Sequence, residues 1–138
     1  MKDLFTGLWT YTQTTSATSF RNGIGSRFFP EYAPEGTQFP YGVYSLDSNI
    51  HDWQFKSDYE EALITLHLFS DDDDGSEIMD LEKKARSAYD DANFTVANHT
   101  LLRFRFDNEW LTAHPDMIPN KIIWQYTIQY SVLLHKNT

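Results

Sequence analysis

Two segments of the chain alternate between apolar and polar residues, and a third repeats its apolar residues at steps of three and four. The alternation in Glu60–Ser70 and Ile122–Leu134 is typical of strands that bury one face. The steps of three and four predict a helix over 76–91. In the second strand the residues expected to face the core are Ile122, Trp124, Tyr126, Ile128, Tyr130, Val132 and Leu134.

Weaker patterns predict one more helix and two more strands. An N-terminal helix has four large apolar residues on one face, Leu4, Phe5, Leu8 and Trp9. Shorter strands are expected at Tyr41–Leu46 and Leu101–Phe106, followed by polar connections at Asp47–Asp58 and Asp107–Asn120. This order indicates a single domain, 1–138, of the α+β class: an antiparallel β-sheet of about four to five strands with two α-helices packed on one face.

Four consecutive aspartates, Asp71–Asp74, precede a glycine and the predicted helix. An EF-hand calcium loop with this glycine at its sixth position needs an acid at its first position and a glutamate at its twelfth. Those positions hold Ser70 and Leu81, so the EF-hand template fails. The charges suit a solvated turn before a helix N-terminus, where Asp74 and Glu77 fit a capping box. A cation site of another type stays open, and we assign no metal ligand.

Composition narrows the classes of function. The 138 residues include no cysteine, which excludes disulfides, thiol nucleophiles and thiolate metal sites. The net charge of −9 argues against a surface that follows nucleic-acid phosphates. Residues 71–91 hold nine acids and three bases, so one helix and the turn before it carry most of this charge. The apolar stretches are too short to cross a membrane, so no membrane partner is expected.

The histidines form no recognised metal or catalytic motif. The chain has no histidine pair with the spacing of a zinc-binding helix, and no GxSxG, phosphate-loop or dinucleotide fingerprint. His51 and His114 lie beside acids in the predicted connections. A deep pocket lined by His51, His114 and Asp116 would favour a small enzyme or ligand-binding domain that uses acid–base chemistry. We assign no catalytic residue and no cofactor.

Arg103 and Arg105 form a small basic strip on an otherwise acidic protein. Phe104 and Phe106 alternate with them and therefore point to the other face of the predicted strand. No aromatic stacking platform lies beside the charges, so we expect no sequence-specific binding of nucleic acid. The strip suits a polar sheet face or a contact between subunits.

The order of the predicted elements resembles that of a known protein family. A Pro/Gly-containing segment ends in an aromatic strand entry over 34–44 (PEGTQFPYGVY), and the strand over 59–70 (YEEALITLHLFS) leads directly into the amphipathic helix. With a helix before them and two strands after them, this order resembles the tail-completion, or tail-terminator-like, proteins of long-tailed bacteriophages and prophages. The resemblance covers nearly the whole chain and rests on structural motifs.

The resemblance implies a non-enzymatic structural protein of the virion. Such proteins form a ring, typically a hexamer, at the head-proximal end of the tail, in the neck, after assembly in the host cytoplasm. The expected partners are further copies of the chain, the tail tube protein and the head connector or stopper protein. An acidic ring lumen would repel the DNA that passes through it. An acidic adaptor or inhibitor that mimics nucleic acid is a further alternative.

Large apolar side chains on the two long connections suggest interface anchors. With the arginine strip, the predicted interface residues are Trp53, Phe55, Trp110, Met117, Ile118, Arg103 and Arg105. The alternative is that the tryptophans fold back and cover the sheet edge.

Overall fold

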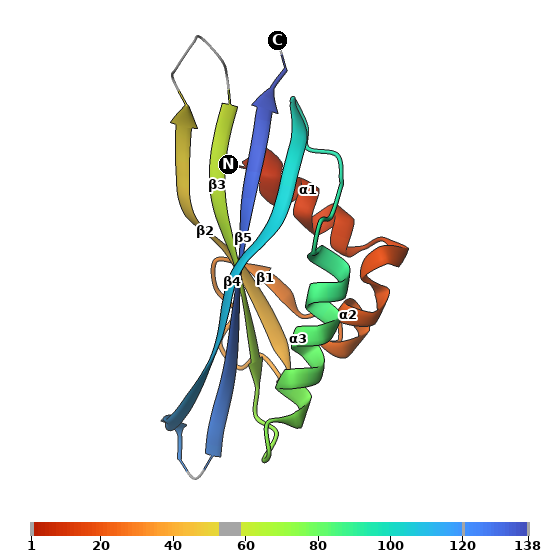
Figure 1. Cartoon of the computed structure of the whole chain (residues 1–138). Helices are drawn as coiled ribbons and strands as arrows, with labels where there is room; N and C mark the ends of the chain where they lie inside the picture. Colours follow the sequence, from red (N-terminus) through yellow and green to blue (C-terminus); the bar gives the residue numbers. More distant parts are fainter. Residues whose placement is uncertain (1, 53–58, 120, 138) are drawn as a thin grey trace.

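The computed structural model describes residues 2–52, 59–119 and 121–137, with the backbone alone at 48–52 and 116–118. The chain forms one sheet and a layer of helices, which confirms the predicted α+β class (Figure 1). The elements are α1 (Lys2–Thr12), a 3-10 helix η1 (Thr15–Ala17), α2 (Thr18–Gly23), β1 (Phe28–Pro30), β2 (Tyr41–Asp52), β3 (Tyr59–Ser70), α3 (Ser76–Tyr89), β4 (His99–Ile118) and β5 (Lys121–Lys136).

The sheet has five strands in the order β1-β2-β3-β5-β4. All neighbours are antiparallel except β1 and β2, which are parallel, so the sheet is mixed and the predicted all-antiparallel pairing is wrong at this edge. The helices cover one face of the sheet, and the lower part of β4 lies apart from them (Figure 1). The two edges therefore differ: β1 has three residues, whereas β4 has twenty.

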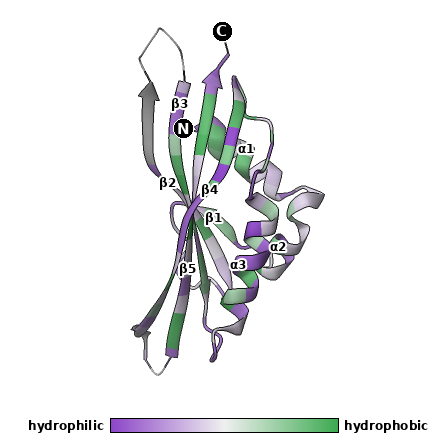
Figure 2. Cartoon of the chain, in the orientation of Figure 1, coloured by the Kyte–Doolittle hydropathy of each residue, from purple (hydrophilic) through white to green (hydrophobic). Residues whose placement is uncertain are grey.

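Residues from the helices and from alternate strand positions form the core. On β3 these are Ala62, Ile64, Leu66 and Leu68, which share one face of the alternating pattern. On α3 they include Ile78, Leu81, Ala85 and Tyr89, as the spacing predicts. On β5 the prediction holds from Ile128 to Leu134 but fails at Ile122, which is 43% exposed while Ile123 is buried. Trp9 is also exposed, so α1 buries only part of its predicted face. In Figure 2 hydrophobic colour continues to the lower end of β5, outside the helical layer.

Strands replace the first half of one predicted connection, 47–52, and most of the other, 107–118. β2 continues from Leu46 to Asp52 opposite β3, and β4 continues through 107–118 opposite β5. A neighbouring strand supplies the backbone hydrogen bonds, so the polar residues of these segments are tolerated on the sheet surface. Bulges interrupt the ladders at Asp47 and at three places in β4, where the sequence pattern loses its period.

The start of α3 differs from the predicted capping box. Gly75 is the N-cap residue, with a positive φ of 75° that favours glycine. The carboxylate of Asp74 accepts a hydrogen bond from the backbone N–H of Ser76 at 3.0 Å, and Glu77 accepts one from the Ser70 hydroxyl at 2.6 Å. Glu77 therefore joins the end of β3 to α3. None of the described helices is long and apolar enough to span a membrane.

Candidate subunit interface

The exposed large hydrophobic side chains gather at the two edges of the sheet. Leu102, Trp110 and Leu111 lie on the β4 edge. Trp9 of α1 and Tyr32, which follows β1, lie at the opposite edge. In the described part of the chain the same class includes only two more side chains, Met79 on α3 and Ile122 near the start of β5. Exposed apolar groups that cluster in this way are typical of contact surfaces.

The lower half of the β4 edge, Asn108–His114, is regular and lacks charge at its centre. Its residues pair in unbroken register with β5 between two irregularities, and the stretch Trp-Leu-Thr-Ala over 110–113 contains no charged residue. Trp110 pairs with Thr127 and lies on the face away from the helices, whereas Leu111 pairs with Tyr126 and lies on the helix-covered face. Both side chains are 43% exposed. An edge strand with these properties offers unpaired backbone groups to another chain.

The upper half of the β4 edge, residues 99–107, is irregular and carries charge, although it also exposes Leu102. Bulges lie between Leu101 and Arg103 and again between Phe106 and Asn108. Beside this half, a hollow is lined by Asp91, Ala92, Asn93 and the β4 residues 101–105. Bulges and charges are the features by which natural edge strands avoid pairing with other chains.

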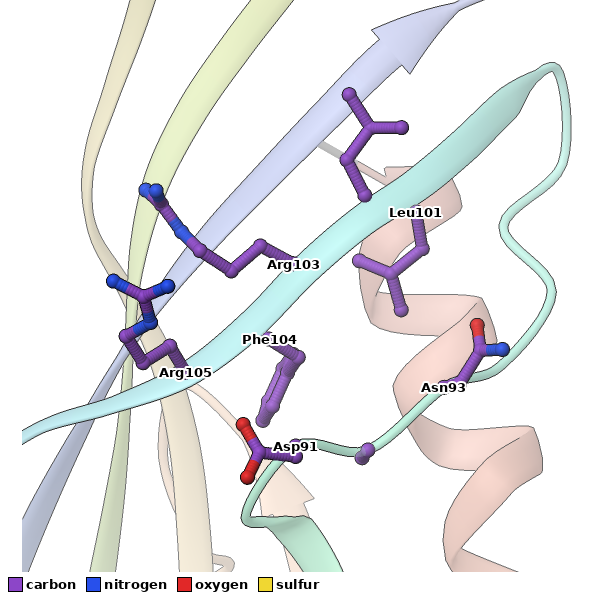
Figure 3. Close-up of a pocket in the computed structure, with 8 residues that line it drawn as sticks. Asp91, Asn93, Leu101, Arg103, Phe104 and Arg105 are labelled. Carbon is purple, nitrogen blue, oxygen red and sulfur yellow. The ribbon is translucent and has the colours of Figure 1, made fainter.

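The two arginines of this half have different surroundings. Figure 3 shows both side chains on the opposite side of β4 from Phe104, as the alternation predicts. The Arg103 guanidinium donates to Glu61 and to Ser131, each at 3.1 Å. Arg105 is exposed and makes no hydrogen bond or ion pair with the described residues. Arg103 therefore joins three strands of its own sheet, and Arg105 is free for another contact.

The β1 edge has a hollow on each face of the sheet. On the helix-covered face, a mostly apolar groove of about 510 Å³ is lined by Lys2, Phe5, Thr6, Trp9, Pro30 and Tyr44. On the open face, a second hollow of about 340 Å³ has a mixed lining of Glu31, Tyr32, Ala33, Tyr41, Val43, His67 and Phe69. The strand between them ends in a proline, which cannot donate a backbone hydrogen bond.

A belt of polar side chains crosses the open face. His67 contacts the Ser45 hydroxyl through Nε2 at 3.2 Å and accepts from the Gln125 amide at Nδ1 at 3.1 Å. Gln125 in turn contacts His114 at 2.7 Å. Burial lowers the pKa of His67, so its ring is neutral at pH 7. The side chains of this belt therefore form hydrogen bonds with one another. This arrangement gives no support to the acid–base pocket considered from the sequence, and the side chains of His51 and Asp116 lie outside the described residues.

A cluster of charged side chains links α3 to the middle of β4. Arg86 donates to the carboxylate of Asp90 at 2.8 Å, contacts Glu109 at 3.2 Å, and lies 3.5 Å from the centre of the Phe106 ring. The burial of Glu82 and the nearby carboxyl of Glu109 raise the pKa of Glu82 to about 7. Much of the acidic charge of α3 is thus paired locally.

Acids elsewhere on α3 and before it have similar local partners. Asp80 pairs with Lys84 at 2.9 Å, and Asp71 pairs with Lys121 at 3.2 Å. In the described residues no group of three or more histidines or acids is placed to hold a metal ion.

The structure brings together only part of the predicted interface. Trp110 lies in β4 rather than on a loop, and it has both arginines on the same face of the same strand. Trp53 and Phe55 lie outside the described residues, as do the side chains of Met117 and Ile118. The sequence analysis missed Tyr32, which has no periodic neighbours, and grouped Trp9 with the apolar face of the N-terminal helix. Phe5, which has the same offset from Leu4 as Trp9 has from Leu8, does pack against the core, so the spacing gave no signal that Trp9 is exposed.

Comparisons with known proteins agree with this architecture. A chain in the structure titled "Virion of native gene transfer agent (GTA) particle" superposes with a TM-score of 0.72 over 94% of this chain and 92% of that chain, at 8% sequence identity. At this identity the likeness concerns the fold. No curated protein matches the sequence significantly. The model of the family "Tail completion protein gp17" matches residues 13–131, and the chain therefore belongs to this family of phage tail structural proteins.

Proposed function

We propose that this protein closes the head-proximal end of a phage tail as a ring of identical subunits. In this role it stops growth of the tail tube and joins the tube to the head connector or stopper protein in the neck of the virion. The observation that carries the proposal is the family match over most of the chain. The ring is expected to be a hexamer, as in the proteins that the sequence resembles.

The surface supports assembly by protein contacts. A mixed sheet with a long bare edge and a short apolar one offers two separate contact regions. The net charge of −9 disfavours binding to DNA phosphates, and within the part of the chain that the structure describes the local pairing of Arg86, Arg103, Lys84 and Lys121 leaves no continuous basic track. A ring wall of this kind lets DNA pass without retaining it.

Removal of the gene from the genome that encodes the protein tests this role. We expect filled heads that lack attached tails, together with tail tubes of uncontrolled length, both visible by negative-stain electron microscopy. Expression of the protein in trans should restore joined particles. Normal particles in the absence of the protein would contradict the proposal.

Binding of DNA is a separate check on the ring wall. Purified protein should not retain duplex DNA at moderate salt, because it has no track of cations whose binding would release counterions. Salt-sensitive retention of DNA would instead favour a nucleic-acid-binding role.

A further inference from the structure

We propose that the lower β4 edge of one copy docks on the β1 edge of a second copy, with Trp110 and Leu111 seated on opposite faces of the neighbouring sheet. This inference rests on the ring proposed above and names the surface that builds it. The occupant is a second copy of this chain, because the exposed apolar residues of the two edges complement each other.

The register places the two contact regions at the same height on the sheet. Trp110 pairs with Thr127, Thr127 with His67, His67 with Val43, and Val43 with Phe29. One row of residues therefore crosses the whole sheet from Trp110 to the middle of β1. A rotation about an axis along the strands brings Trp110 of one copy to this level of the next copy.

The strand directions fit the same arrangement. β2 is antiparallel to β3, β3 to β5, and β5 to β4, so β4 is antiparallel to β2 and also to β1, which is parallel to β2. The β4 strand of one copy thus approaches the β1 strand of the next in the antiparallel sense. Pro30 has no backbone N–H, and the N–H of Phe28 already donates to the carbonyl of Ser26, so side chains rather than a continued hydrogen-bond ladder make most of the contact.

The faces also correspond. Trp110 lies on the open face, where three aromatic rings of the neighbour's hollow, Tyr32, Tyr41 and Phe69, offer a contact surface beside the polar Glu31 and His67. Leu111 lies on the helix-covered face, where the neighbour's groove holds Phe5, Trp9, Pro30 and Tyr44. The short β1 strand ends between these two hollows, so the two projecting side chains straddle it.

Because the two edges differ, the contact is head-to-tail. Such a contact leaves a free β4 edge on one copy and a free β1 edge on the other, so it repeats until a ring closes. A symmetric contact of β4 with β4 would instead stop at a dimer and leave Trp9 and Tyr32 bare.

Two double variants separate the edges. The first, Trp110→Thr with Leu111→Thr, removes the apolar groups of the β4 edge while it keeps residues that favour strands. The second, Trp9→Gln with Tyr32→Ser, removes the apolar groups of the β1 edge. Met79→Gln serves as the matched control, because Met79 has similar exposure and lies on neither edge. The thermal midpoint of each variant monomer reports whether it folds.

Sedimentation velocity of each variant alone and of their mixture gives the result. We expect each double variant to be a folded monomer, with subunit affinity lowered about tenfold or more, and the control to assemble like the natural protein. An equimolar mixture of the two variants should form one-to-one dimers and nothing larger, because it retains one intact pair of edges.

Three outcomes would overturn the inference. Rings formed by either double variant would place the interface elsewhere and leave the ring itself intact. A mixture that stays monomeric, when the natural protein assembles, would exclude the head-to-tail contact between these edges. A natural protein that remains monomeric at high concentration would exclude self-docking, whereas the gene-deletion phenotype would still decide the role in the tail.

Discussion

The two halves of β4 carry similar alternating residues but have different surroundings. In the upper half Phe104 is buried, stacked on Tyr130 with ring centres 4.9 Å apart. In the lower half Trp110 and Leu111 are both substantially exposed. The upper half lies beside the C-terminal end of α3 and the segment that follows it, whereas the lower half beyond Glu109 extends away from the helices (Figure 1). The cover supplied by other elements, rather than the residue pattern, decides which aromatic residues form the core.

The two halves of the β4 edge also differ in the features that prevent pairing with another chain. The upper edge has two bulges and two arginines, whereas the lower edge has seven residues in regular register with an uncharged centre. In natural monomeric proteins, bulges and charged side chains keep edge strands from pairing with other chains. This contrast is the basis of our proposal that the lower half is the edge that takes part in assembly.

Truncation of one aromatic residue in each half should give the largest difference. Phe104→Ala should lower the free energy of unfolding by about 3–5 kcal/mol, the range for large buried side chains. Trp110→Ala should lower it by less than about 1 kcal/mol, because its exposed site loses little packing. Urea denaturation measures both values. Equal losses at the two positions would mean that Trp110 is a core residue and that the halves do not differ.

The pH dependence of stability tests the junction between the halves. Glu82 has its pKa raised to about 7, and it lies beside Arg86 and the β4 residue Glu109. The folded protein therefore holds a proton that the unfolded chain releases near its ordinary pKa of 4.5. Stability should fall between about pH 4.5 and pH 7, by on the order of 1 kcal/mol or more.

Glu82→Gln is the matched variant for this effect. The amide resembles the protonated carboxyl and does not ionise, so the fall in stability over this range should largely disappear. At pH 8 the variant should be more stable than the natural protein. An unchanged pH profile would mean that other groups cause the dependence.

The arginines of the upper half should give the smallest effects. Arg103→Ala loses its contacts to Glu61 and Ser131 and should cost about 0.5–1 kcal/mol, as is usual for partly exposed ion pairs. Arg105→Ala should leave monomer stability unchanged within about 0.5 kcal/mol. Thermal unfolding of the two variants side by side measures the difference. A larger loss at Arg105 would show that this side chain has a structural role.

The sequence predicts well the elements that pack between the sheet and the helices, and it predicts poorly the strand segments that extend beyond the helices. The core positions of β3 and α3 follow directly from their spacing, because one face of each element is buried along its whole length. The extents of β2 and β4 were underestimated. Asp47, Asp52 and Pro115 look like connection residues, and only the neighbouring strands, distant in sequence, turn these segments into a ladder.

The proposed interface follows from the sequence only in part. Trp110 is a predicted anchor because large apolar side chains on long connections resemble interface residues, whereas its place on an edge strand comes from the structure alone. The β1 edge could not be predicted, since the parallel pairing of Phe28–Pro30 with β2 brings together Trp9 and Tyr32 from separate segments. No local pattern encodes that juxtaposition.

Amide hydrogen exchange of β4 tests the central claim, that its lower half is where subunits meet. In the monomer, the outward-facing amides of Asn108–His114 lie on a bare edge and should exchange rapidly. In the assembled ring they should become protected by about tenfold or more, because a neighbouring chain covers the edge and excludes water. Exchange at the same rate in the monomer and in the ring would contradict the account.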